Sequence, residues 1–172
     1  MTGKPLILLD VDGVLNALAL QPGPAWERHT CQSWNGTYRV RLNPAHGPML
    51  LNLAAETGAE LVWATTWTSD ANKQIGPKIG LPELPVIDVL SGEDEPWVNA
   101  KVPPVADYVN GRPFVWLDDD LNDDDRAYLA KHDGVGEFLI VDVAPRSGLS
   151  AYHVQQAADW LASLAAPSGG GS

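Results

Sequence analysis

Two pairs of carboxylates follow two short apolar runs in this chain. Asp10 and Asp12 end the run "LILLDVD", and Asp118 and Asp119 end the run "VWLDD". If both runs are parallel strands of one sheet, their carboxyl ends meet at one edge and the carboxylates converge there. Converging carboxylates repel one another unless a cation neutralises them, and a hard divalent cation is the usual remedy. We therefore expect a Mg²⁺ site formed by Asp10, Asp12, Asp118 and Asp119.

Further polar groups fall where the same sheet edge is expected. The run "ELVWATTW" ends in the hydroxyls of Thr65 and Thr66, and Lys101 begins the segment that leads to the second carboxylate pair. Together with a cation, a lysine and a threonine supply donors to a phosphate group, so the set is typical of phosphoryl transfer. Thr65 is the preferred hydroxyl because it follows the strand directly, and Thr66 is the alternative. Lys73 and Lys78 lie in the same interval as Lys101 and remain alternatives to it.

Five short apolar runs predict the strands that position these groups. Each run is apolar at successive positions instead of alternating, which indicates strands covered on both faces in a parallel sheet. Helical patterns separate the runs, so we expect a three-layer α/β/α Rossmann-like fold with right-handed crossovers. The five predicted strands are Leu6 to Leu9, Leu61 to Ala64, Val86 to Val89, Phe114 to Leu117 and Phe138 to Val141.

Two segments have clear helical patterns, and a third departs from the alternation. Residues 44–57 carry an apolar face at helical spacing, and Ser150 is positioned to cap a last helix. Residues 17–43 instead contain the stretch "CQSWNGTYRVRLN", in which Asn35 and Gly36 are a turn signal for a hairpin. We expect this segment to form a small flap beside the end of the first strand.

The order Asp-x-Asp, threonine, lysine and Asp-Asp resembles the four motifs of the haloacid dehalogenase (HAD) superfamily, most of whose members are phosphatases. More narrowly, "VRLNP" followed by "ELVWATTWTSDAN" is similar to the HAD branch described from RNA-repair polyproteins. The resemblance implies a nucleophile, a general acid and base, two residues that position the phosphoryl group, and the metal carboxylates. In that order, these are Asp10, Asp12, the pair Thr65 and Lys101, and the pair Asp118 and Asp119.

The activity implied is a Mg²⁺-dependent phosphomonoesterase that acts through an aspartyl phosphate. The intervals between the motifs are too short for a cap domain, so we expect an open site that admits the end of a large molecule. The resemblance favours a nucleic-acid end as substrate. The acidity of the chain favours a small phosphate ester or a phosphopeptide, and both alternatives stay open.

Several residues around these motifs are candidates for substrate binding. Gly13 follows the first carboxylate pair and marks the turn that lets both carboxylates reach one phosphate. Thr66 is a second candidate, beside the preferred Thr65. Trp26, Trp34 and Trp67 lie near the predicted site and could stack on a substrate base or sugar.

The composition limits the class of protein. A length of 172 residues with 45% hydrophobic residues fits one domain, which we place at residues 1–166, with a flexible Gly/Ser tail at 167–172. The net charge of -11 opposes long-range binding of polyanions, although a local basic groove is still compatible with it. Cys31 is the only cysteine, so the chain has no internal disulfide, and a cytoplasmic location fits. No membrane segment and no obligate protein partner are expected.

Three other interpretations compete with the enzyme. A receiver-type phosphoacceptor domain uses the same residue types, but there the acidic pair comes first and the lysine last. A catalytically idle binding module with the same fold is the second rival. The third concerns the acidic run after Asp118: its spacing fits a calcium loop poorly, and we expect Asp123 to Asp125 to be a solvated helix start.

Overall fold

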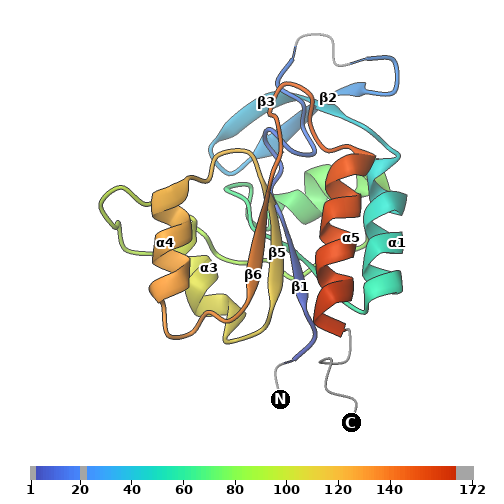
Figure 1. Ribbon diagram of the computed structural model, residues 1–172. Helices are drawn as coiled ribbons and strands as arrows, with labels where there is room; N and C mark the ends of the chain where they lie inside the picture. Colours follow the sequence, from blue (N-terminus) through green and yellow to red (C-terminus); the bar gives the residue numbers. More distant parts are fainter. Residues whose placement is uncertain (1–2, 20–22, 166–172) are drawn as a thin grey trace.

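The computed structural model describes residues 3–19 and 23–165, with a parallel sheet of four strands as its middle layer (Figure 1). The strand order is β4-β1-β5-β6. The predicted three-layer α/β/α Rossmann-like architecture is confirmed, and the predicted tail at 167–172 lies outside the described residues. The strands are β1 (Leu6–Leu9), β4 (Glu60–Trp63), β5 (Phe114–Asp118) and β6 (Phe138–Asp142).

Helices cover both faces of this sheet (Figure 1). Helices α1 (His46–Thr57) and α5 (Ala151–Ala165) cover one face, and α3 (Val102–Val109) and α4 (Asp123–Lys131) cover the other. A short π-helix, η1 (Ala71–Ile75), and helix α2 (Gly76–Ile79) lie between β4 and α3. No helix in the described ranges is long and apolar enough to cross a bilayer.

The apolar strand β1 supplies both halves of the core. Leu6 and Leu8 are fully buried in the cluster that includes α3, whereas Ile7 and Leu9 are fully buried in the cluster that includes α1 and α5. Alternate side chains of a strand point to opposite faces, so a continuous apolar run is what a strand between two helical layers requires. This packing fixes β1 in the centre of the sheet, with the carboxylate motif at its end.

The prediction of a fifth strand at Val86 to Val89 is wrong. Only Val86 pairs with the sheet, in an isolated bridge to Trp63. The bridge consists of the Trp63 N–H donating to the carbonyl of Pro85 and the Ile87 N–H donating to the carbonyl of Trp63, both at 2.9 Å. The N–H of Val89 then donates to the carbonyl of Ile87, so the chain turns away at once. A proline, which has no N–H, and this tight turn limit the pairing to one residue.

The predicted flap is present as an antiparallel hairpin between β1 and α1. It consists of β2 (Glu27–Ser33) and β3 (Gly36–Leu42) and lies above the carboxyl edge of the sheet (Figure 1). Ser33 pairs with Gly36, so the two connecting residues are Trp34 and Asn35, one position earlier than the predicted Asn35-Gly36 turn. Within residues 3–19 and 23–165, this hairpin is the only insertion of strands outside the main sheet, and the described chain has no cap domain.

The hairpin is fastened to the domain on both sides. Cys31 is buried, and its thiol donates to the carbonyl of Gln74 in η1 at 3.6 Å. The backbone N–H of Gln32 donates to the side-chain oxygen of Gln74 at 3.1 Å. On the other strand, the carbonyl of Arg41 accepts from the N–H of Ala17 at 3.2 Å. The hairpin therefore has a defined position relative to the loop after β1.

Candidate active site

The loop after β1 presents Asp10 at the carboxyl edge of the sheet. Asp10 is buried, and its backbone N–H donates to the carbonyl of Leu117 in β5 at 3.2 Å. The chain then reverses at Gly13, which has a φ of +81° and donates its N–H to the carbonyl of Asn16 at 2.8 Å. Glycine adopts this left-handed conformation without the steric cost that a Cβ brings. The predicted turn at Gly13 is therefore present.

Three carboxylates converge where β1 and β5 end. One oxygen from each of Asp10, Asp118 and Asp119 lies within 4.8 Å of the other two, so the group could hold a metal ion. Asp118 is fully buried and accepts a hydrogen bond from the N–H of Asp120 at 2.8 Å. Gly13 leaves the space that Asp119 occupies, because a Cβ at Gly13 would lie 2.1 Å from its Oδ2. The carboxylate cluster thus depends on a glycine as well as on acids.

Lys101 lies among these carboxylates. Its Nζ donates to Oδ2 of Asp118 and lies 3.2 Å from Oδ2 of Asp10. Burial by itself lowers the pKa of Lys101, but the two neighbouring carboxylates outweigh burial and raise the pKa above its ordinary value, so the ammonium group stays charged. The structure does not bring Lys73 or Lys78 to this cluster: Lys73 is exposed on η1, and Lys78 donates to the carbonyl of Gln74 at 2.8 Å.

One lysine does not balance three carboxylates. Burial raises the pKa of Asp10 well above its ordinary value, and the charges of Asp118 and Asp119 raise it further, while Lys101 and the N–H of Val11 oppose the rise. Burial and Asp118 also raise the pKa of Asp119. The cluster therefore has excess negative charge, which a bound cation would compensate.

Asn99 and Asp125 hold the segment that carries Lys101. The side-chain oxygen of Asn99 accepts from the N–H of Lys101 at 3.0 Å, and its amide nitrogen donates to the carbonyl of Asp120 at 3.2 Å. Asp125 is fully buried and accepts from the N–H of Asn99 at 2.7 Å. The prediction of a solvated helix start is therefore wrong for Asp125, whereas Asp123 is fully exposed.

The carboxylate of Asp12 lies outside the three-carboxylate cluster. The prediction that the side chain of Asp12 is a metal ligand is therefore not supported. Oδ1 of Asp12 accepts from Nδ2 of Asn16 at 2.8 Å, and Oδ2 accepts from Nε1 of Trp67 at 3.0 Å. Asn16 is itself held, because its Oδ1 accepts from the N–H of Arg41 at 2.8 Å. Asn16 is a residue of the site that no sequence pattern indicates, since its only signal is its position six residues after Asp10.

The two threonines after β4 have different environments. Thr65 is buried, and its hydroxyl accepts from the N–H of Trp67 at 3.2 Å. Thr66 is exposed and lines the same pocket as Asp10, Asp12 and Lys101. The structure therefore brings Thr66 to the pocket wall, whereas the preferred Thr65 is buried and does not line the pocket. The hydroxyl of Thr65 is the acceptor in its bond with Trp67, so its own hydrogen remains available for donation to another group.

Asp10, Asp12, Thr66 and Lys101 line an open pocket of about 300 Å³ at the carboxyl edge of the sheet. Asp119 and Asn99 contribute to its wall together with Asp10, Asp12 and Lys101. A pocket at this edge is where doubly wound α/β folds bind ligands. Of the residues predicted from the sequence, Asp10, Asp12, Thr66, Lys101 and Asp119 thus lie around one pocket.

The three candidate tryptophans have three different environments. Trp34, at the tip of the hairpin, is 59% exposed, and its Nε1 donates to the carbonyl of Thr66 at 2.9 Å. Trp67 is only 3% exposed, so the prediction that it stacks on a substrate is wrong, and its role is to hold Asp12. Trp26 makes an edge contact with His46 at a centroid distance of 5.1 Å, and it does not line the pocket. Only Trp34 presents its ring to solvent beside the site.

Comparison with known proteins supports the same interpretation. No curated protein and no solved structure matches the chain. A family model described as the HAD domain in Swiss Army Knife RNA repair proteins matches residues 6–154, which include every pocket residue named above. A match over most of the chain is sufficient to establish which family the chain belongs to. This chain therefore belongs to the family of HAD domains found in Swiss Army Knife RNA repair proteins.

Proposed function

We propose that this chain is a Mg²⁺-dependent phosphomonoesterase that acts through a phosphorylated Asp10. The observation that carries the proposal is the convergence of Asp10, Asp118, Asp119 and Lys101 in an open pocket. Membership of a HAD family supports phosphatase activity. The domain responsible is residues 1–166, and a cytoplasmic location is proposed from the single free cysteine.

The carboxylate cluster fits a magnesium ion in its chemistry. Asp10, Asp118 and Asp119 would supply oxygen ligands, which Mg²⁺ prefers, and their excess negative charge provides the attraction. When bound there, Mg²⁺ would neutralise the cluster and polarise an oxygen of the substrate phosphate. Asp12 is not needed as a side-chain ligand, since both of its oxygens accept hydrogen bonds from Asn16 and Trp67.

The first proposed step is displacement of the leaving group by Asp10. A carboxylate oxygen of Asp10 forms a bond to phosphorus, the bond between phosphorus and the ester oxygen breaks, and Asp12 donates a proton to that oxygen. In the second step Asp12 takes a proton from water, the water oxygen bonds to phosphorus, and the bond to Asp10 breaks. The products are an alcohol, inorganic phosphate and the original enzyme.

Donors around the pocket would hold the phosphoryl oxygens. Lys101 supplies a buried positive charge, and the hydroxyl of Thr65 or Thr66 supplies a neutral donor. The backbone N–H groups of Asp12 and Thr66 have no acceptor among residues 3–19 and 23–165, although both residues line the pocket. Free backbone donors of this kind bind oxyanions, so their position supports phosphate as the ligand.

The test of this proposal measures turnover, the dependence of turnover on a metal ion, and the position of a covalent label. We expect the protein to hydrolyse p-nitrophenyl phosphate, to lose activity in EDTA, and to regain it with Mg²⁺. Mg²⁺ should also raise the unfolding temperature, an effect that does not depend on turnover. Borohydride trapping followed by mass spectrometry should find the label on Asp10, and Asp10→Asn should abolish it.

Contrary outcomes separate the competing functions. Full activity after exhaustive chelation would remove the metal from the mechanism. Phosphorylation that stops at one group per chain would indicate a phosphoacceptor domain, and a protein with neither label nor turnover would be a binding module. Label on Asp12 or on a threonine would contradict the assignment of the nucleophile.

For the substrate we propose a nucleic-acid end. The open pocket, the absence of a cap among the described residues and the exposed ring of Trp34 suit the terminus of a large molecule, and the family description names RNA repair. Small phosphate esters and phosphopeptides are the alternative. Specificity constants for 3′- and 5′-phosphorylated oligonucleotides, mononucleotides, sugar phosphates and phosphopeptides decide between them. The proposal fails if oligonucleotide ends react no faster than mononucleotides.

A further inference from the structure

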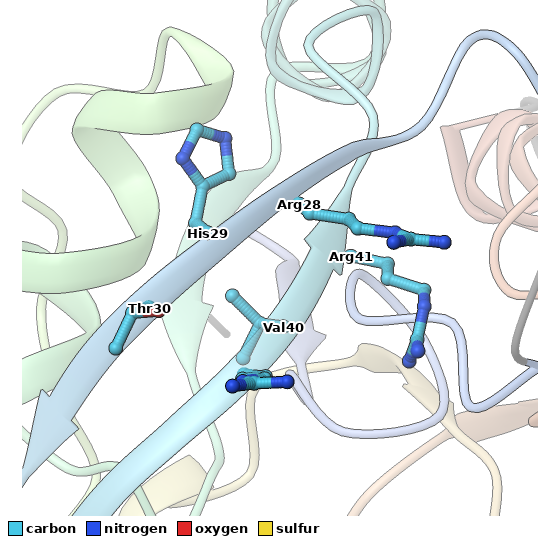
Figure 2. Close-up of a pocket in the computed structure, with 6 residues that line it drawn as sticks. Arg28, His29, Thr30, Val40 and Arg41 are labelled. Atoms are coloured by element: carbon cyan, nitrogen blue, oxygen red, sulfur yellow. The ribbon is translucent and has the colours of Figure 1, made fainter.

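The hairpin above the pocket has one face rich in arginine. Arg28 pairs with Arg41 across the two strands, and Thr30 pairs with Arg39. Residues two apart in a strand share a face, so these four side chains lie together, and we call them the arginine face. Figure 2 shows Arg28 and Arg41 extending to the same side of the hairpin, with His29 extending the other way.

None of the three arginines forms an ion pair within the described residues, although the chain contains 22 acidic residues. Like charges opposite one another on a hairpin repel, so this arrangement costs stability unless an anion is present. In addition, Nε of Arg41 is buried and has no hydrogen-bond acceptor in the described part of the chain. The arginine face is therefore a concentration of uncompensated positive charge on a protein with a net charge of -11.

This face has the shape and chemistry to take phosphates. It borders a hollow of about 330 Å³ that residues of both strands line, namely Arg28, His29, Thr30, Arg39, Val40 and Arg41. A guanidinium group donates two parallel hydrogen bonds to a phosphate, a geometry that an ammonium group does not offer. Arg39 and Arg41 are two positions apart in β3, which separates their backbones by about 7 Å. That separation is comparable to the distance between successive phosphates along a nucleic-acid strand.

The arginine face is connected to the candidate active site by a short chain of hydrogen bonds. The N–H of Arg41 donates to Oδ1 of Asn16, and Nδ2 of the same asparagine donates to Asp12. At the tip of the hairpin, Trp34 bonds to the carbonyl of Thr66, a residue of the pocket wall. One element therefore carries the arginines, an exposed aromatic ring, and direct contacts with the site.

We infer that the arginine face binds the backbone phosphates of a single-stranded polynucleotide whose terminal phosphate lies in the pocket. Trp34 supplies a ring on which a base near the end stacks. The placement of the terminus rests on the proposed function, but the binding of the strand does not. The overall acidity of the protein is compatible with this role, because the charge that acts on the strand is local to the hairpin.

The test measures strand binding without turnover. A fluorescent single-stranded oligonucleotide of about 12 nucleotides, without a terminal phosphate, is titrated with protein in EDTA at several salt concentrations. Three phosphate contacts predict a slope of about -2 for log affinity against log salt, and therefore about a 20-fold loss between 50 and 200 mM. The double variant Arg28→Gln with Arg39→Gln should reduce the slope to about -0.7 and the loss to about 3-fold.

The matched control removes two positive charges from another part of the surface. Lys4 and Lys131 are exposed at the opposite edge of the sheet, where β1 begins and α4 ends. The double variant Lys4→Gln with Lys131→Gln should retain the wild-type slope and the wild-type turnover of p-nitrophenyl phosphate. Circular dichroism and thermal unfolding verify that both double variants are folded.

The contrary outcomes are distinct. The inference is overturned if the two double variants bind alike, or if wild-type binding does not depend on salt. It is also overturned if a phosphopeptide of equal charge displaces the oligonucleotide as well as unlabelled oligonucleotide does, since the face would then be an acidic-peptide site. A protein that binds the strand through the arginine face but never hydrolyses p-nitrophenyl phosphate would refute the proposed phosphatase and leave this inference standing.

Discussion

The carboxylate of Asp12 is held at both oxygens by side chains from separate segments. Asn16 comes from the loop after β1, and Trp67 comes from the loop after β4. A general acid and base must have a fixed position relative to the leaving oxygen, and second-layer hydrogen bonds supply that position. In the proposed reaction Trp67 is therefore a positioning residue, which would act through Asp12.

Replacing Trp67 by phenylalanine tests this role. Trp67→Phe keeps a buried ring and removes the N–H donor. Because a hydrogen bond to a charged group is worth ~1.5–3 kcal/mol, we expect kcat to fall about 10- to 150-fold with little change in KM. Steady-state kinetics with p-nitrophenyl phosphate measures the effect. Trp160→Phe on α5 is the control and should retain wild-type kcat. Equal values of kcat in the two variants would show that the indole N–H has no role in the reaction.

Gly13 provides the second test at this scale, because its missing Cβ leaves room for Asp119. In Gly13→Ala the new Cβ would lie 2.1 Å from Oδ2 of Asp119, so this carboxylate must move out of the cluster. We expect turnover to fall about 10- to 100-fold and the stabilisation by Mg²⁺ to disappear.

Gly58 is the matched control for the backbone effect. Its φ of +73° resembles that of Gly13, but no atom lies within 4 Å of a Cβ built there. Gly58→Ala should cost ~1–2 kcal/mol of stability through backbone strain alone and should retain activity. If both variants lose activity equally, strain and not the space beside Asp119 explains the loss.

Residue types and order predicted the reacting groups, and tertiary contacts determined their supports. The carboxylates, Lys101 and Thr66 are residue types whose chemistry can be read from the sequence, and the structure places them around one pocket. Asn16 and Asn99 could not be predicted, because an asparagine in a loop has no signature until its hydrogen-bond partners are known. The prediction that Trp67 stacks on a substrate fails because the position of this residue in the sequence does not reveal that it is only 3% exposed.

At the scale of elements, the start of α4 fastens the segment that carries Lys101. Asn122 and Asp125 form a reciprocal capping box, in which the side chain of each accepts from the N–H of the other. Asp125 also accepts from the N–H of Asn99, whose side chain holds the N–H of Lys101. A helix cap on one side of the pocket thereby positions the lysine that directly precedes α3.

Asp125 and Asp123 make a matched pair for testing this element. Asp125→Ala removes one half of the capping box and leaves the N–H groups of Asn99 and Asn122 without their acceptor, so we expect a loss of ~2–4 kcal/mol in the free energy of unfolding and a lower kcat. Asp123→Ala removes an exposed acid from the same turn and should change neither quantity. Urea unfolding and kinetics measure both variants. Equal stability of the two variants would refute the structural role of Asp125.

Elements with strong patterns were predicted well, and elements decided by pairing were not. The runs that became β1, β4 and β5 are buried on both faces, which is the property their apolar composition reports, and the edge strand β6 is partly buried. The run from Val86 to Val89 has the same composition, but its pairing ends after one bridge. The hairpin was predicted with a turn one residue late, because register depends on pairing across the strands.

On the scale of the whole molecule, His46 lies where three parts of the chain meet. It begins α1, its Nε2 bonds to the carbonyl of Leu149 before α5 at 2.8 Å, and its ring contacts Trp26 before the hairpin. Burial lowers the pKa of His46, and the hydrogen bond to Leu149 only partly opposes this shift. The folded protein therefore holds His46 in its neutral form.

This burial predicts a dependence of stability on pH. The unfolded chain takes up a proton at His46 near the ordinary pKa of about 6.5, whereas the folded chain does so only at lower pH. Between these two pKa values the unfolded state binds more protons at this residue, so the contribution of His46 to the free energy of unfolding should fall as pH decreases, by at most about 1.4 kcal/mol per pH unit. Urea unfolding between pH 7.5 and 5.5 measures the slope. His46→Gln should flatten it, and an unchanged slope would assign the dependence to other groups.

The fold directs both of its ends away from the pocket. β1 begins and α5 ends at the lower edge in Figure 1, opposite the hairpin and the carboxylate cluster. A further module joined at either end would extend from the far side of the sheet and leave the pocket open. A fused module that holds the same substrate would raise the effective concentration of its terminus at Asp10, which increases the rate at low substrate without any change in the catalytic groups.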